Sequence, residues 1–549
     1  MPLDTLITGR IATLAGESGF GWVEAIGIRD GRVAFAGSEV YLETRADPFT
    51  ERITLAPDEV ALPGLTDAHM HLARAAIATR HVDLTSAGTL DEGLARIRAA
   101  HDVMPDASTW LEGHGWDSDR WGGWPTAAGL ERVAPGRPVA LWAHDHHALL
   151  ASRAALAIAG IDRSTPDPAG GVIRRGPDGE PEGVLLESAT KLLTVHIPVV
   201  AGADLEAAIV AISHELISLG VVAVHDPGGL APDPDLEGSY PAYAHLSETG
   251  RLPLRVMASF SDDALDTALA GGLRSGAILG ADPNGRARVG WQKLFADGSL
   301  GSRTAALLSD IEPEADRPLA PERRRGVWNT QPERLGELAK RAAAGGIATQ
   351  IHAIGDAAVR AALDALEPTA GRVPFMPRLE HVQLLDPADR GRFAAGGIAA
   401  SVQPAHLGSD AARARKLWGS RAETNGYTWR SIAATGAVVA FGTDAPVEPF
   451  DPWPGIALAV RREDLGWPAG TPPFGPSEAL TLERAIRAAC VDPATSARET
   501  DRGRLAVGQR ADVVVIPAAA IDEPVEPGGA LATARPSIVI MDGRVVFEA

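Results

Sequence analysis

Short apolar runs alternate with alanine-rich amphipathic segments through the middle of the chain. The runs have the length of buried strands, whereas segments such as 332–346 and 356–368 carry apolar residues at helical spacing. This alternation is typical of βα units around a parallel sheet. It favours an α/β fold with a closed (β/α)8 barrel of the TIM type, whose eight strands are expected at 59–68, 220–226, 253–260, 289–298, 347–356, 378–384, 397–404 and 437–446.

The two ends of the chain have a different pattern, in which short strands are separated by turns. Asp30-Gly31 and Asp542-Gly543 each stand between two alternating apolar segments, as a hairpin turn does. The simplest arrangement for two such β-rich ends is to pair with each other in one small sheet domain. We therefore expect a composite β-sandwich from residues 1–60 plus 500–549 and a barrel over 61–499.

The barrel pattern is interrupted after its first strand by a stretch at about 80–205. Segments within it, such as STWLEGHGWD and RPVALWAHDHHALL, have the composition of strands. The stretch is too structured to be a linker. We expect it to form an inserted, lid-like subdomain.

Two histidines stand one residue apart at the end of the first apolar run, in LPGLTDAHMHL (62–72). Side chains at i and i+2 of a strand point to the same face, so His69 and His71 would converge on one point. Two neutral imidazoles aimed at one point make half of a metal site. For an isolated pair, two hydrogen-bonded histidines at a strand end are the alternative.

Further potential metal ligands lie at the C-terminal ends of later strands, which form the mouth of such a barrel and carry its catalytic residues. They are Lys293, His352, His381 and Asp444. Taken singly, the lysine has an alternative as a snorkelling side chain, the histidines as core residues and the aspartate as a turn or helix cap. Their joint occurrence at strand ends favours a metal centre.

Lys293 lies among apolar residues in WQKLF, where desolvation lowers the pKa of an amine and leaves it nucleophilic. A neutral amine captures carbon dioxide, and the resulting carbamate is able to bridge two divalent ions. The first-strand histidines would hold one ion, and His352 and His381 the other. Asp444 would contact one ion and accept a proton when the bridging hydroxide attacks.

Composition narrows the class of protein further. The 549 residues are 45% hydrophobic and 22% charged, as in a soluble globular protein. The 51 basic and 71 acidic residues give a net charge of -20, which disfavours nucleic acid and anionic membranes as partners. A single cysteine, Cys490, excludes an intramolecular disulfide framework, and the N-terminal segment lacks signal-peptide features, so a cytoplasmic location is expected.

Several motifs occur together along nearly the whole chain: LPGLTDAHMHL, KLFADGSLGSRTAAL, QIHAIGDAAV, RLEHVQLL, SVQPAH, FGTDAPVEPFDPW and GRLAVGQRADVVVI. In this order they closely resemble the amidohydrolase superfamily, in particular the long metal-dependent branch that includes N-substituted formamide deformylases. The resemblance implies a (β/α)8 hydrolase with a composite β-sandwich. Its metal positions match His69, His71, Lys293, His352, His381 and Asp444, with Asp444 and His381 also catalytic.

The resemblance implies one or two divalent ions, zinc being favoured by a histidine-rich site. It implies hydrolysis of a C–N bond, in an amide or N-substituted formamide, by a metal-bound hydroxide. A lactone, carbamate or ester hydrolase on the same centre and a non-catalytic metal-binding scaffold are the alternatives. The expected partner is a small-molecule substrate; a homodimer is left open.

Substrate contacts are expected from two regions. Asp297 and Arg303 follow Lys293 into its loop, and Trp116 and His147 lie on the insertion. Where members of the family have an Asn-Ser pair after the insertion's GH motif, this chain has Ser152-Arg153. A different substrate pocket is therefore expected.

Overall fold

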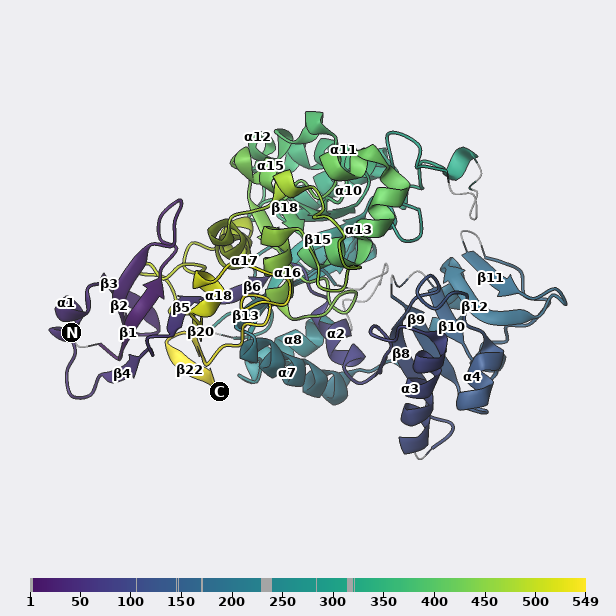
Figure 1. The fold of residues 1–549 in the computed structure, drawn as a ribbon, viewed down its shortest axis with the longest axis horizontal. Helices are drawn as coiled ribbons and strands as arrows, with labels where there is room; N and C mark the ends of the chain where they lie inside the picture. The colour runs from purple at the N-terminus through teal and green to yellow at the C-terminus, as the bar shows by residue number, and fades with distance from the viewer. Residues whose placement is uncertain are drawn as a thin grey trace. The chain divides into compact units, whose positions relative to one another are not determined.

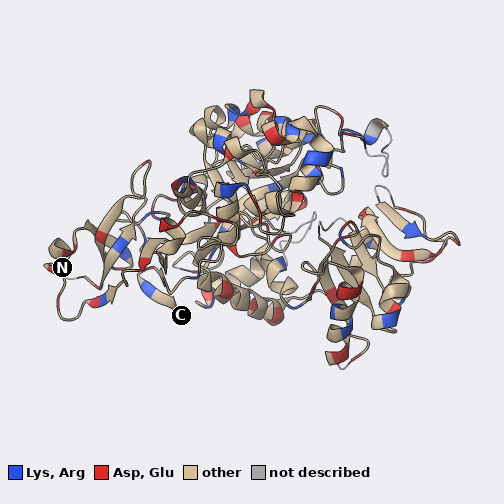
Figure 2. Ribbon diagram, viewed as in Figure 1, with Lys and Arg blue, Asp and Glu red and all other residues tan. Residues whose placement is uncertain are grey.

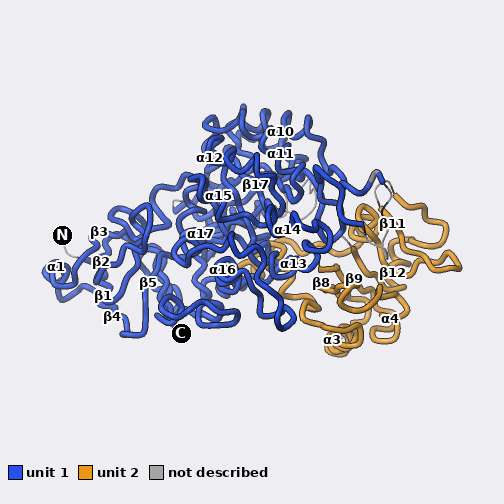
Figure 3. Tube along the Cα trace, turned by 45° about the horizontal axis from the view of Figure 1, so that its top comes forward, with its two compact units in different colours: residues 1–72, 210–549 blue, residues 73–209 orange. Residues whose placement is uncertain are grey.

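The chain forms two compact units in the computed structural model, which describes residues 3–104, 106–144, 146, 148–168, 171–228, 239–282, 284–313, 319 and 321–549. One unit comprises residues 1–72 and 210–549, and the other comprises 73–209 (Figure 3). Basic and acidic residues are interspersed along the ribbon (Figure 2). In the part of the chain that is described, no helix is both long and apolar enough to cross a lipid bilayer.

The larger unit contains an eight-stranded parallel sheet in which each strand pairs with the next one along the chain, which confirms the predicted TIM-type barrel. Its strands are β6 (Leu65–Asp67), β13 (Val221–Asp226), β14 (Arg255–Ser261), β15 (Ala287–Phe295), β16 (Thr349–Ala353), β17 (Arg378–His381), β18 (Ala399–Val402) and β19 (Val439–Phe441). Amphipathic helices lie between them, and Leu335, Leu338, Ala339 and Ala342 make the buried stripe of one. The principal helices of this unit are α7 (Gly202–Ser218), α8 (Ser239–Glu248), α10 (Pro332–Ala344), α11 (Asp356–Leu366), α13 (Pro404–Trp418), α16 (Pro452–Arg461) and α17 (Leu482–Ser496) (Figure 1).

The first predicted strand, 59–68, is in fact two strands that belong to different sheets. β5 (Glu59–Pro63) pairs antiparallel with β20 (Val513–Pro517), whereas β6 enters the barrel beside β13. Gly64 stands at the change of sheet, and a Cβ there would lie 2.7 Å from the Val222 side chain. The apolar run continues through this change because both strands are buried.

The barrel closes between its last and first strands through contacts beyond the short strand β6. The Ala68 N–H donates to the Phe441 carbonyl at 2.9 Å, and the Asp444 N–H donates to the His69 carbonyl at 2.7 Å. The Asp67 carboxylate accepts hydrogen bonds from the Thr443 hydroxyl and from backbone N–H groups on both sides. The seam therefore runs directly through the predicted ligands.

Strands from both ends of the chain form one sheet in the order β22-β21-β20-β5-β1-β2-β3, with β4 also paired to β1 (Figure 1). The Asp30-Gly31 and Asp542-Gly543 hairpin turns are confirmed, and all four residues have positive φ, as a type I′ turn requires. One apolar cluster contains residues from both ends. The strands not yet given are β1 (Thr5–Ala12), β2 (Trp22–Arg29), β3 (Arg32–Gly37), β4 (Glu51–Thr54), β21 (Ile538–Met541) and β22 (Arg544–Glu548).

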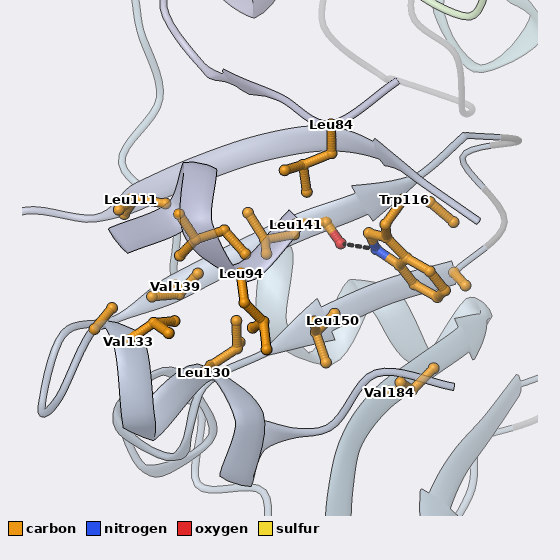
Figure 4. Close-up of a cluster of buried hydrophobic side chains, with 14 residues drawn as sticks. Leu84, Leu94, Leu111, Trp116, Leu130, Val133, Val139, Leu141, Leu150 and Val184 are labelled. Carbon is orange, nitrogen blue, oxygen red and sulfur yellow. Dashed lines mark hydrogen bonds between the residues drawn. The ribbon is translucent and has the colours of Figure 1, made fainter. Parts of the chain in front are cut away.

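The second unit, residues 73–209, has a six-stranded mixed sheet in the order β11-β12-β10-β9-β8-β7. Trp116 lies in its hydrophobic core at 1% exposure, and its indole N–H donates to the Leu141 carbonyl at 2.7 Å (Figure 4). The elements are β7 (Val82–Asp83), β8 (Leu111–Trp116), β9 (Val139–Ala143), β10 (Ala148–Ala151), β11 (Gly171–Arg175) and β12 (Pro181–Glu187), with α3 (Leu90–Val103), α4 (Ala127–Val133) and α5 (Arg153–Ile158).

Gly442→Ala should destabilise the larger unit, because the added Cβ would lie 2.4 Å from the backbone nitrogen of His69. Overpacking of this kind costs about 1–3 kcal/mol. The free energy of unfolding, measured in denaturant, should fall accordingly. Gly336→Ala in α10 is the control, since nothing lies within 4 Å of its Cβ and alanine favours a helix. Equal stability of both variants would contradict the close approach at the seam.

Candidate metal centre

His69 and His71 lie just beyond β6, with both imidazoles directed at Asp444. The Nε2 atoms of His69 and His71 are 3.3 and 3.2 Å from Asp444 Oδ1, and all three side chains are buried. The other ring nitrogens are anchored: His69 Nδ1 lies 2.5 Å from Glu380 Oε2, and His71 Nδ1 contacts the Gly228 carbonyl. The two histidines thus converge as the sequence spacing predicts. The bend after β6 directs them to one point, and neither histidine lies in the strand itself.

The protons in this group are located by the partners of the Nδ1 atoms. A carboxylate and a carbonyl only accept hydrogen bonds, so both Nδ1 atoms carry the proton and a neutral ring leaves a lone pair on Nε2. Burial lowers the pKa of His71, which favours its neutral form. Two imidazole lone pairs and a carboxylate oxygen therefore face one another.

A divalent cation fits this point. His69 Nε2 and Asp444 Oδ1 are buried and have no hydrogen-bond partner among the described residues. Ligands bound at about 2.0–2.1 Å to a tetrahedral zinc ion lie about 3.3–3.4 Å apart, which matches the separations from Asp444. His69, His71 and Asp444 are thus a coherent ligand set.

A second group on the other side of Asp444 includes His406, which the sequence analysis did not single out. His406 Nε2 lies 3.1 Å from Asp444 Oδ2, and its Nδ1 lies 3.1 Å from Glu448 Oε1. Burial lowers the pKa of His406, but hydrogen bonds to the two carboxylates outweigh it and raise the pKa to about 10. His406 lies on α13 and ends the SVQPAH motif, and this motif is the sequence feature that could have identified it as a site residue.

His381 completes this second group, which offers ligand atoms from His381, His406 and Asp444. Its Nδ1 lies 2.8 Å from Gln403 Oε1, so Nδ1 is the donor and Nε2 keeps the lone pair. Both His381 and Asp444 have positive φ, +75° and +62°. Left-handed backbone in such residues is uncommon and is typical of functional sites, where the surrounding structure holds it.

His352 and Lys293 lie near this centre with other contacts. The rings of His352 and His381 are 4.5 Å apart, but His352 Nε2 lies 3.0 Å from the Gly298 carbonyl. Lys293 is 2% exposed, and burial lowers its pKa to about 8 against the opposing effect of Glu380 and Asp444. The carboxylates of Glu380 and Asp444 thus favour the charged form of the lysine, which the sequence did not reveal. Metal binding by His352 and Lys293 remains a prediction.

Arg378, buried inside the barrel, supports the first group from below. Its guanidinium donates to Glu380 Oε1 at 2.9 Å and to the Ala68 carbonyl at 2.6 Å. Burial raises the pKa of Glu380, but Arg378 and His69 outweigh it and hold the pKa well below its usual range. A fully ionised Glu380 thus fixes the ring of His69.

The predicted substrate contacts fare differently. The Asp297 carboxylate is buried and accepts the backbone N–H groups of Ala306, Ile354 and Gly355 at 2.8, 3.0 and 2.9 Å, so it organises two loops. Trp116 has the surroundings of a core residue. The substrate contacts of both residues remain predictions. Arg303 lies in the loop after β15, with φ +61°, and its substrate contact remains a prediction. His147 lies outside the described residues.

A parallel barrel in which buried histidines and an aspartate converge beyond its strands defines a metal-dependent hydrolase. The model of the amidohydrolase family matches residues 56–547, and the chain belongs to this family. Protein LONG AFTER FAR-RED 3 of Arabidopsis thaliana is 32% identical over 95% of this chain and 88% of its own. The N-substituted formamide deformylase of Arthrobacter pascens is 28% identical over 90% of each chain. An uncharacterized metal-dependent hydrolase from Pyrococcus horikoshii OT3 has a similar structure, with a TM-score of 0.73 and 25% identity over 93% of this chain and 97% of that one.

His71→Ala should lower the metal content of the purified protein, because it removes one of three converging ligands. The measurement is elemental analysis of protein loaded with zinc and then dialysed. His245→Ala on α8 is a matched control, since that histidine is exposed and lies outside both ligand groups. Wild-type metal content in His71→Ala would refute the ligand assignment.

Proposed function

We propose that this chain hydrolyses a C–N bond in a small amide or N-substituted formamide at the centre formed by His69, His71 and Asp444. The observation that supports it most is the convergence of three buried side chains, with Asp444 Oδ1 3.3 and 3.2 Å from the Nε2 atoms of His69 and His71. The similarity to an N-substituted formamide deformylase favours this bond among those that the family cleaves.

The histidines and Asp444 would hold a divalent ion, zinc by the donor set. When bound, such an ion lowers the pKa of a water molecule and polarises a carbonyl oxygen. Glu380 and the Gly228 carbonyl keep the two imidazoles in the tautomer that this role needs. Burial of the three side chains excludes bulk water from the ligand atoms.

Asp444 and His406 provide for the movement of protons. Asp444 has one oxygen toward the first-strand histidines and the other 3.1 Å from His406 Nε2. Because each nitrogen of His406 faces a carboxylate oxygen, the ring holds two protons and is a source of one. An amide nitrogen is a poor leaving group until it is protonated, so a proton donor beside the acceptor suits a C–N bond. His381, with its free Nε2, is proposed to contact the reacting group.

Lys293 is proposed to carry a carbamate that bridges a second ion. A carbamate forms from the neutral amine, and burial of Lys293 favours that form. The carboxylates of Asp444 and Glu380 favour the ammonium form, so the support is weaker than purely apolar surroundings would give. A second ion would be held by His381 and Asp444, with His352 as the further ligand that the sequence predicts. The number of ions per chain therefore discriminates between the two states of the lysine.

Lys293→Ala should reduce the metal content from two ions to one per chain if the carbamate bridges them, because two cations without a central anion repel each other. Metal stoichiometry is measured side by side with the wild type and with Lys340→Ala, an exposed lysine on α10. One ion per chain in the wild type and in Lys293→Ala would refute the bridged pair.

Asp444→Asn should reduce kcat for the preferred substrate by at least 100-fold while the barrel stays folded, because the amide keeps the shape but does not accept a proton. Turnover is measured on a panel of N-substituted formamides, acetamides, carbamates and lactones with metal-loaded protein. Preference for the formamides or acetamides supports the proposal. Preference for lactones or carbamates would mean that the same metal centre cleaves a different bond. Metal binding without turnover of any compound in the panel would indicate a non-catalytic scaffold.

A further inference from the structure

A second cavity lies at the opposite end of the barrel from the metal centre, within the larger unit. It has a volume of about 390 Å³ and is lined by residues 223–225 of β13, by the N-terminal parts of β14 and β15 and by residues 497–502. Volumes of about 300–1,000 Å³ are typical of sites for small molecules. Neither of the two groups of metal ligands contributes to its lining.

Arginine dominates the lining of this cavity, although the chain as a whole has a net charge of -20. One glutamate and one aspartate, Glu499 and Asp501, are the lining carboxylates among the described residues. The arginines are Arg255, Arg286, Arg288, Arg498, Arg502 and Arg510. Positive charge is therefore concentrated where the rest of the surface is acidic.

Part of this charge is already balanced by the protein. Arg502 lies 2.5 Å from Glu499, and Arg510 lies 3.1 Å from Asp501. Asp512 and Asp542 pair with Arg255, and Asp542 is shared with Arg510. These pairs hold the terminal sheet against the barrel.

The guanidinium groups of Arg288 and Arg498 are in no ion pair among the described residues. Arg288 donates to the carbonyls of Gly285 and Gly276, and Arg498 donates to that of Val373. Neither arginine has a carboxylate within ion-pair distance among the described residues. Arg286 is 3.9 Å from Asp542, which also pairs with Arg255 and Arg510. A guanidinium has five N–H donors, so most donors of Arg288 and Arg498 are available to a ligand.

We propose that this cavity is a binding site for a small anion with at least two acidic oxygens, a phosphate or a polycarboxylate. The planar guanidinium forks of Arg288 and Arg498 match such groups in a bidentate geometry. The site is separate from the metal centre, so it binds its ligand without turnover.

The test is isothermal titration of metal-loaded protein with inorganic phosphate and with citrate at constant ionic strength. Wild type should bind at least one of them, and the one bound identifies phosphate or polycarboxylate as the ligand class. The double variant Arg288→Gln/Arg498→Gln should weaken binding at least tenfold. Arg334→Gln/Arg430→Gln changes the charge equally at two exposed positions and should bind like the wild type.

The same titration on metal-free His71→Ala distinguishes the cavity from the metal centre, because anions also bind to metal ions. Unchanged affinity in this variant supports the cavity. The proposal is overturned if neither probe binds to the wild type, if the two double variants lose affinity equally, or if binding disappears with the metal.

Discussion

The buried guanidinium of Arg378 is the constraint on which the centre depends. It is fully buried inside the barrel and contacts its own strand through Glu380 and four other strands or their ends through His225, Gln350, Ser401 and the Ala68 carbonyl. A buried charge is tolerated only when its hydrogen bonds are complete, and removal of one partner typically costs about 3–5 kcal/mol. The same contacts that satisfy Arg378 therefore fix the carboxylate that orients His69.

The centre is also located at the seam of the barrel. His69 and His71 follow the first strand, and Asp444 follows the last one. Their backbones exchange hydrogen bonds, from Asp444 N–H to the His69 carbonyl and from His71 N–H to the Ala445 carbonyl, at 2.7 and 2.9 Å. Closure of the barrel and assembly of the first ligand group are thus one event. This explains why Gly442, at the same seam, lies against the backbone of His69.

The sequence predicted those features that depend on local pattern. The apolar runs located the barrel strands, the Asp-Gly pairs located two hairpins, and the strand ends pointed to His69, His71 and Asp444. It did not predict the change of sheet at Gly64, because both sides of the glycine are buried and equally apolar. It also did not predict the backbone partners of Asp297, which come from two loops that no local pattern relates.

His406 and Glu380 were missed for a similar reason. His406 stands on a helix after β18 and not at a strand end, so the rule that catalytic residues follow strands passed over it. Glu380 was hidden in a strand next to His381, and its importance comes from Arg378 and His69, one of which is distant in sequence. Charged residues inside a barrel are recognised only when their partners are known.

The terminal sheet has a consequence for biosynthesis. β5 stays an open edge until β20 pairs with it, and these strands lie near opposite ends of the chain. A ribosome therefore releases almost the whole polypeptide before β5 is covered. Exposed edges of this kind promote wrong pairing between chains. In a newly made chain, β5 is therefore open to wrong pairing until β20 has been synthesised.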